Sequence, residues 1–210
     1  MHIPVGEVLR YMGWRGKVPD GAVLSAVEKA LGLVNETAAP RAVYKVFSYT
    51  DGKLAEADLM LPGEDIARHL KGADKVVLLA ATLGIDVDRT ESTLARTSAL
   101  DALAFDAAAS AAIEEFLDEV SDKISADLNR TLGARFSPGY GDLPIECQAP
   151  FIKLLRADKE IGLTLNEEYN MIPLKSVTAL IPVGAECPRD KTHDCARCSM
   201  SGCAFSSEKK

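Results

Sequence analysis

The stretch from residue 85 to residue 132 contains neither proline nor glycine, and alanine is the most frequent residue within it. From Leu100 to Ile124, apolar side chains recur every three to four positions. This is the spacing of one face of a helix, and alanine has the highest helix propensity of all residues. The stretch therefore predicts one or two long helices, which we expect Gly133 to stop.

Two segments before this stretch have the composition of β-strands. Ala42–Tyr49 is rich in β-branched and aromatic residues, and the Asp51-Gly52 pair that follows predicts a hairpin with a second arm at Leu54–Leu61. Lys75–Ala81 is a short apolar run, as expected of a central strand that is buried on both faces. Further elements are expected at residues 177–183 (strand) and at 5–12, 19–37, 63–70 and 145–157 (helices). The chain is therefore predicted to have an α+β fold.

Length, composition and charge limit the possible classes of protein. A chain of 210 residues with 47% hydrophobic residues can bury a core, so we expect one domain at residues 1–184 and a cysteine-rich, metal-binding tail at 185–210. The formal net charge of −7 argues against a nucleic acid or an anionic membrane as partner. No apolar run reaches the roughly 20 residues that span a bilayer, and the first residues lack the features of a signal peptide. We expect a cytoplasmic protein.

The segment 135–144 has the composition of a ligand-binding loop. It contains Pro138, Gly139, Gly141 and Pro144, which cannot continue a helix or occupy a central strand. The same segment offers a guanidinium at Arg135, which suits a carboxylate, and an aromatic ring with a hydroxyl at Tyr140. This combination suits a zwitterionic, partly aromatic small molecule. The alternative is a tight turn in which Tyr140 packs on the core and Arg135 covers a helix end.

Some other residues could belong to a functional site but also have ordinary structural explanations. Thr82 and Gly84 follow the expected central strand, a common place for ligand contacts, but a helix N-cap and a simple turn explain them as well. This turn has a single glycine, whereas the cofactor turns of conventional methyltransferases need several. The acidic residues between 106 and 122 are expected to form a solvated helix face, and His69 to be an ordinary surface or core histidine.

Four of the five cysteines lie close together near the end of the chain, at Cys187, Cys195, Cys198 and Cys203. In a reducing compartment such a cluster indicates a metal site more often than disulfides. The two-residue separation of Cys195 and Cys198 lets both sulfurs bind one metal, and four thiolates suit either zinc or an iron–sulfur cluster. An alternative function follows, a small iron–sulfur or zinc protein whose tail is the functional centre and whose 135–144 loop is structural.

The chain also resembles a known family. Arg-Phe-Ser-Pro-Gly-Tyr at 135–140, Asp-Leu-Pro at 142–144, Met-Ile-Pro at 171–173 and Ser-Val-Thr at 176–178 resemble signatures of the reactivation domain of cobalamin-dependent methionine synthase. The match is closer to free-standing relatives of that domain. They share a Tyr-x-Gly-Trp/Tyr-x-Gly pattern, which is Tyr-Met-Gly-Trp-Arg-Gly at 11–16 here, then Ala-Ala-Thr-Leu-Gly at 80–84, the Pro-Gly-Tyr loop and a closing cysteine cluster. The resemblance covers essentially the whole chain. Two positions depart from the synthase pattern: Gly141 replaces a proline, and Ala-Leu-Ile at 179–181 replaces an aromatic pair.

This resemblance implies a fold and a function. The fold would be α+β, with a twisted antiparallel sheet and long flanking helices. S-adenosylmethionine would bind at Arg135, Pro138, Gly139 and Tyr140. The protein would be an accessory factor in methionine biosynthesis that reactivates a cobalamin-dependent methyltransferase, with S-adenosylmethionine as methyl donor to the Co(I) corrinoid.

The resemblance also implies partners. Cobalamin would be contributed by a corrinoid protein, or by a methionine synthase lacking its own activation domain. A flavodoxin or a ferredoxin would supply the electron. Little activity is expected from the protein alone, because no acid–base or nucleophilic set is visible in the sequence.

Overall fold

A computed structural model describes residues 1–14 and 18–184 of the chain. Its main element is a five-stranded sheet of order β3-β2-β1-β4-β7, in which all neighbouring strands are antiparallel. The strands are β1 (Arg41–Thr50), β2 (Lys53–Leu54), β3 (Leu59–Met60), β4 (Lys75–Thr82) and β7 (Ser176–Val183). Two further short strands, β5 (Thr164–Leu165) and β6 (Met171–Ile172), form a separate hairpin that the sequence did not predict.

Strand β4 lies in the centre of the sheet, as predicted. It pairs with β1 on one side, where Val77 lies opposite Val46, and with β7 on the other, where Leu79 lies opposite Ala179. Every residue of β4 after Lys75 is buried. A strand covered on both faces needs apolar residues at consecutive positions, which accounts for the continuous apolar run.

The hairpin predicted at Asp51-Gly52 is present, but its second arm is interrupted. Both turn residues have positive φ, 51° and 80°, as a two-residue hairpin loop requires. A 3₁₀ turn, η1 (Ala55–Ala57), separates β2 from β3. In this turn the Glu56 carboxylate accepts hydrogen bonds from the backbone N–H and the hydroxyl of Ser48 on β1. A side chain thus takes the place of a continuous strand partner.

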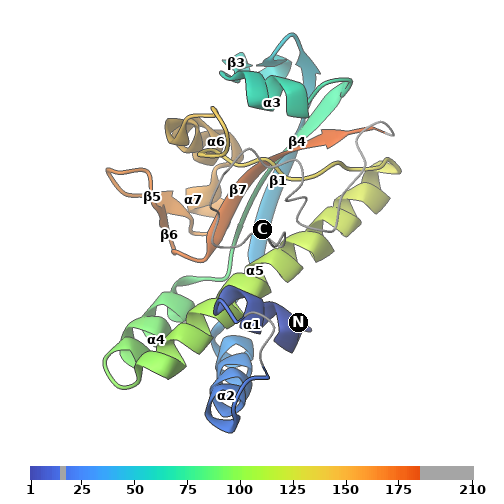
Figure 1. Cartoon of the computed structure of the whole chain (residues 1–210). Helices are drawn as coiled ribbons and strands as arrows, with labels where there is room; N and C mark the ends of the chain where they lie inside the picture. Colours follow the sequence, from blue (N-terminus) through green and yellow to red (C-terminus); the bar gives the residue numbers. More distant parts are fainter. Residues whose placement is uncertain (15–17, 185–210) are drawn as a thin grey trace.

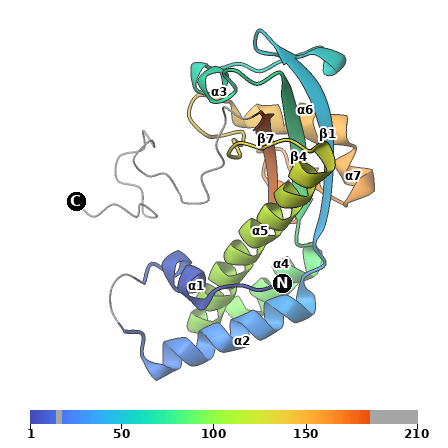
Figure 2. The ribbon, with the colours of Figure 1, turned by 90° about the vertical axis from the view of Figure 1, so that its right-hand side faces the viewer.

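The helices form two groups on opposite sides of the sheet (Figures 1 and 2). The long helix α5 runs diagonally along one side and extends past the end of the sheet, where α1, α2 and α4 pack against it. Helices α6 and α7 lie on the other side, and α3 lies beside the hairpin end of the sheet. The bounds are α1 (Val5–Tyr11), α2 (Gly21–Thr37), α3 (Glu64–His69), α4 (Ile85–Ala95), α5 (Ala99–Leu128), η2 (Ile145–Cys147), α6 (Gln148–Leu155) and α7 (Ala157–Glu160).

The long helical stretch therefore forms two helices. Ser98 begins the second one, because its side chain accepts a hydrogen bond from the backbone N–H of Asp101. The prediction that Gly133 stops this helix is wrong: the helix ends at Leu128, and Asn129 caps it in the left-handed conformation with φ 50°. The chain leaves the helix early because residues 131–136 run beside β7, where the Gly133 N–H donates to the Pro182 carbonyl at 2.9 Å.

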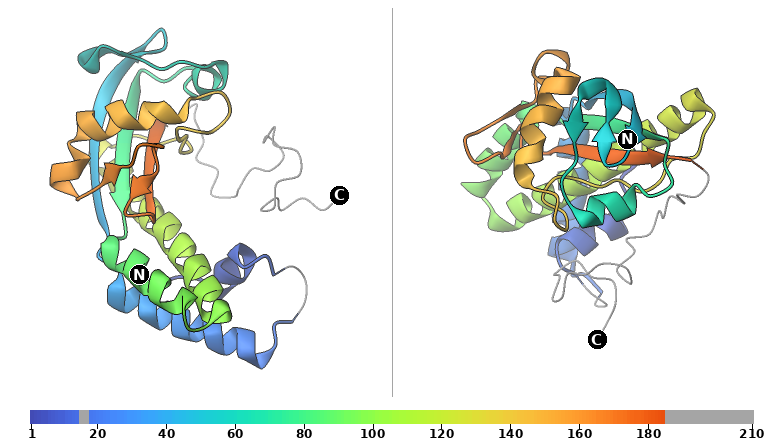
Figure 3. Two further views of the ribbon diagram at one scale, coloured as in Figure 1. Left: turned by 90° about the vertical axis from the view of Figure 1, so that its left-hand side faces the viewer. Right: turned by 90° about the horizontal axis from the view of Figure 1, so that it is seen from above.

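Two hydrophobic cores lie on the two faces of the sheet. Val77, Leu79 and Ala81 of β4 face the core formed with α1, α2, α4 and α5. The alternate residues Val76, Leu78 and Ala80 face the second core, formed with α3, α6 and α7. The predicted α+β class, with a curled antiparallel sheet and long flanking helices, is thus confirmed (Figure 3). Among the described helices, none is both long enough and apolar enough to cross a bilayer.

Candidate functional site

The 135–144 loop begins at the edge of the sheet. Phe136 forms a two-way backbone bridge with Leu180 of β7, at 2.9 and 2.8 Å. The rest of the loop then closes on itself, because the Gly139 N–H donates to the Leu143 carbonyl at 2.8 Å and the Tyr140 N–H to the Ser137 carbonyl at 3.0 Å. Gly139 has φ 89°, which favours glycine. The irregular backbone expected from the composition is confirmed.

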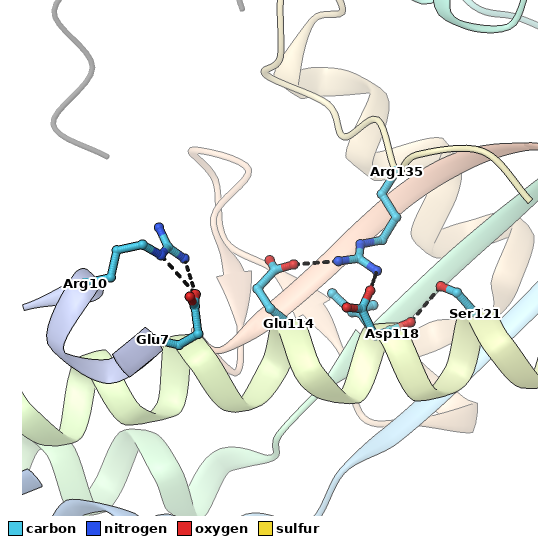
Figure 4. Close-up of polar contacts among 7 residues, drawn as sticks. Glu7, Arg10, Glu114, Asp118, Ser121 and Arg135 are labelled. Atoms are coloured by element: carbon cyan, nitrogen blue, oxygen red, sulfur yellow. Dashed lines mark hydrogen bonds and ion pairs between the residues drawn. The ribbon is translucent and has the colours of Figure 1, made fainter. Parts of the chain in front are cut away.

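Arg135 reaches from the loop to the exposed side of α5 (Figure 4). Its two terminal nitrogens contact Glu114 Oε2 and Asp118 Oδ1, each at 2.7 Å. Burial alone would lower the pKa of Arg135, whose side chain is only 21% exposed, but the charges of Glu114 and Asp118 and the hydrogen bonds to them raise it. The guanidinium is therefore charged and already paired.

The two carboxylates belong to the acidic run that was expected to be a solvated helix face. That interpretation is incomplete. Glu114 and Asp118 are 37% and 40% exposed but also hold Arg135, and Asp106, 46% exposed, also pairs with Lys175 of the β6–β7 turn. The sequence contained a signal for the first pair, since residues four apart on a helix lie on one face. Nothing in the sequence indicated that the partner lay 17 and 21 residues further along the chain.

Tyr140 is exposed beside this charged group. Its side chain is among the exposed large hydrophobic ones, at 59%, and its ring meets the edge of the Phe136 ring at a centroid distance of 6.0 Å. Partial desolvation and then the charge of Glu114 raise the pKa of the Tyr140 hydroxyl, so this hydroxyl lies within electrostatic range of the carboxylate. The same loop thus carries an exposed ring at Tyr140 and a paired guanidinium at Arg135.

Helix α1 adds residues that the sequence did not assign to the site. Helix α1 packs against α5, and burial and then the charge of Glu114 raise the pKa of Tyr11 on this helix. The guanidinium of Arg10 lies 4.3 Å from the centre of the Tyr11 ring and pairs with Glu7 at 2.7 Å. Figure 4 shows the Glu7–Arg10 pair on α1 beside Glu114 of α5. Three segments, α1, α5 and the loop, therefore meet around Glu114.

The other predicted ligand residues of the loop differ in accessibility. Pro138 is buried, whereas Gly139 is exposed. A Cβ at Gly139 would lie 3.3 Å from Cδ1 of Ile145, so a side chain there would be crowded in addition to being strained. Gly139 leaves the main chain open to close approach.

The structure does not bring Thr82 and Gly84 to this site. Thr82 pairs with Ser176 at one end of β7, four residues from Leu180, which corresponds to about 13 Å along a strand. The Thr82 hydroxyl is fully buried and bonded to the Gly84 N–H at 3.0 Å and to the Ser176 hydroxyl at 2.8 Å. Gly84 is the N-cap residue of α4. These contacts favour the cap and turn alternative.

The cysteines of the predicted metal site, Cys187, Cys195, Cys198 and Cys203, lie outside the described residues. Within residues 1–14 and 18–184, no group of three His, Cys, Asp or Glu side chains is placed to hold a metal ion. The metal site of the tail, and with it the boundary near residue 184, stays a prediction.

Comparisons with known proteins show a likeness among solved structures. No protein-family model matches the chain, and no curated protein matches it significantly. Among solved structures, the fold is similar to the crystal structure of the MetH reactivation domain bound to AdoHcy, with a TM-score of 0.59 and 18% sequence identity over 89% of this chain and 78% of that chain. The chain thus has the fold of that reactivation domain, and the fold expected from the resemblance is confirmed.

Proposed function

We propose that this protein binds S-adenosylmethionine at the 135–144 loop and acts as an accessory factor that reactivates a corrinoid-dependent methyltransferase. One observation carries the proposal. Arg135, Glu114, Asp118 and Tyr140 form a half-exposed charged and aromatic group in a chain whose fold matches a reactivation domain bound to AdoHcy.

The charges of this group fit the proposed ligand. S-adenosylmethionine carries a carboxylate, an ammonium, a sulfonium and an aromatic base. Arg135 would pair with the carboxylate through N–H groups not used by its bonds to Glu114 and Asp118, since a guanidinium has five. Glu114 and Asp118, whose side chains are 37% and 40% exposed, would receive the cationic groups. Tyr140 and the open backbone at Gly139 would line the adenosyl part. Each charge of the ligand would then have an opposite charge in the protein.

The remaining chemistry would come from outside this chain. A corrinoid protein, or a methionine synthase lacking its own activation domain, would contribute the methyl acceptor, and a flavodoxin or ferredoxin the electron. This chain would bind and orient the methyl donor and exclude water. A zinc ion or an iron–sulfur cluster at Cys187, Cys195, Cys198 and Cys203 belongs to the same proposal as a separate site. Turnover is expected only with the corrinoid partner present.

Calorimetric titration with S-adenosylmethionine tests the binding step. We expect the wild-type protein to bind and Arg135→Ala to bind at least about tenfold more weakly, because the variant leaves the ligand carboxylate unpaired and a charged hydrogen bond is worth roughly 1.5–3 kcal/mol. Arg89→Ala is the matched control, since Arg89 makes only an exposed ion pair within α4, with Asp86. No binding by the wild-type protein would refute the proposal.

A second candidate function rests on the tail. If the four cysteines are the functional centre, the Arg135 ion pairs are purely structural, and the protein is a small iron–sulfur or zinc protein. Metal analysis and absorption spectra of protein purified without oxygen separate the two functions. A visible absorption band in a protein that does not bind S-adenosylmethionine would favour this second function.

A further inference from the structure

Helix α3 and the 135–144 loop fit together through two glycines and two aspartates. A Cβ at Gly63, the N-cap of α3, would lie 2.9 Å from Cγ of Asp142 in the loop. In the opposite direction, a Cβ at Gly141 in the loop would lie 2.9 Å from Cβ of Asp65 in α3. Both glycines have positive φ, 125° and 52°. The positive φ of Gly141 excludes a proline at this position, because the proline ring fixes φ near −65°.

Hydrogen bonds at the start of α3 stabilise this contact between the helix and the loop. The carboxylate of Asp142 accepts the backbone N–H of Glu64 at 2.6 Å and that of Asp65 at 3.0 Å. These N–H groups belong to the first turn of α3 and have no partner within the helix. A residue 77 to 78 positions further along the chain thus provides the N-terminal cap that α3 lacks locally.

The other end of α3 contacts the other end of the loop. Nε2 of His69, the last residue of α3, lies 2.9 Å from the Ala134 carbonyl oxygen, next to Arg135. A carbonyl oxygen can only accept, so Nε2 carries the proton. The His69 ring lies 5.0 Å from the Phe136 ring, which in turn contacts Tyr140. The expectation that His69 is an ordinary surface or core histidine therefore misses its contact with the loop.

We propose that α3 is the positioning element of the ligand loop, and that Asp142 and His69 set the affinity of the site without touching the ligand. The proposal rests on the proposed function. The two contacts lie at the two ends of α3 and at the two ends of the segment that carries Arg135 and Tyr140. A loop fixed at both ends loses less conformational freedom on binding, so its ligand binds more tightly.

Four variants, made in the full chain, test this proposal by titration with S-adenosylmethionine. Asp142→Ala removes the cap of α3 and His69→Ala removes one hydrogen bond, and we expect each to weaken binding about fivefold, as for the loss of one hydrogen-bonded contact. Asp142→Asn keeps an acceptor oxygen and His69→Gln keeps a donor near the Nε2 position, so both should recover most of the affinity. Asp158→Ala, an exposed residue of α7, is the matched control. Equal affinity in all four variants and the wild type would overturn the proposal.

Amide hydrogen exchange separates this proposal from the proposed function. In Asp142→Ala we expect faster exchange at residues 64–65 and 139–143 and unchanged exchange in β4, as for a local opening. If the wild-type protein does not bind S-adenosylmethionine, the proposed function fails and exchange alone decides the role of α3. Unchanged exchange in the loop of both alanine variants would then refute the positioning role, and faster exchange would support it.

Discussion

Arg135 carries one positive charge and contacts two carboxylates, so the group formed with Glu114 and Asp118 has a net charge of −1. S-adenosylmethionine has a net charge of +1 near neutral pH, whereas S-adenosylhomocysteine, which lacks the sulfonium, has none. At the proposed site, S-adenosylmethionine should therefore bind more tightly than S-adenosylhomocysteine. The preference should be modest, because the carboxylates are more than a third exposed and water screens them.

The variant Glu114→Gln tests this charge preference. We expect the ratio of the affinities for S-adenosylmethionine and S-adenosylhomocysteine to fall about threefold, because removing one half-exposed charge changes the interaction by roughly 0.7 kcal/mol. The measurement is a pair of calorimetric titrations of the same preparation. Glu115→Gln, one residue along the helix and therefore on a different face, should leave the ratio unchanged. An unchanged ratio in Glu114→Gln would mean that this carboxylate only positions Arg135.

The same residues show what the sequence could predict about the site. Arg135, Gly139 and Tyr140 could be proposed as site residues because each has a side chain or backbone property that is rare in ordinary loops, and their contact with a ligand stays a prediction. Glu114 and Asp118 were not found, because their partner lies outside their own helix and an exposed acidic face looks the same with or without it. Sequence patterns report local geometry, and this site is made by a tertiary contact.

The helices and strands also divide into those that are specified by their own residues and those that depend on tertiary contacts. Those specified by their own residues were predicted well, as in the case of β4, whose continuous apolar run follows from burial on both faces. The end of α5 was misplaced because Asn129 can adopt the left-handed conformation that Gly133 was expected to supply, and pairing with β7 requires the earlier end. Helix α3 was predicted, but its cap comes from Asp142 and could not be recognised locally.

The N-cap of α5, Ser98, is a local sequence signal that can be tested by mutation. Ser98→Ala removes the side-chain oxygen that accepts the Asp101 N–H, and we expect it to lower the free energy of unfolding by about 1 kcal/mol, or roughly 2–4 °C in melting temperature. Ser98→Asp should restore most of the stability, because aspartate is an equally good cap. Thermal unfolding followed by circular dichroism provides the measurement. If the aspartate variant is as unstable as the alanine variant, the cap is not the cause.

At the scale of the whole molecule, the sheet is shared by two cores and the 135–144 loop lies where they meet. Arg135 extends to α5, which packs on the first core, while its neighbour Phe136 packs against the second. The loop also contributes Leu143, which is fully buried in the second core. The geometry of the site therefore depends on both layers being folded together.

This dependence predicts that the described domain unfolds as one cooperative unit. Leu78 and Leu79 are adjacent in β4 and fully buried, one in each core, so Leu78→Ala and Leu79→Ala should each cost about 2–5 kcal/mol. In both variants, the transition followed by far-ultraviolet circular dichroism should coincide with the transition followed by the fluorescence of Trp14, the single tryptophan, which lies just after α1. Urea titrations of the two variants provide the measurement. Two results together would contradict this prediction: only Leu79→Ala shifts the tryptophan transition, and the circular dichroism of Leu78→Ala shows two steps. The two layers would then unfold separately. In that case the loop could lose its contacts with α3 while Arg135 stays bound to α5.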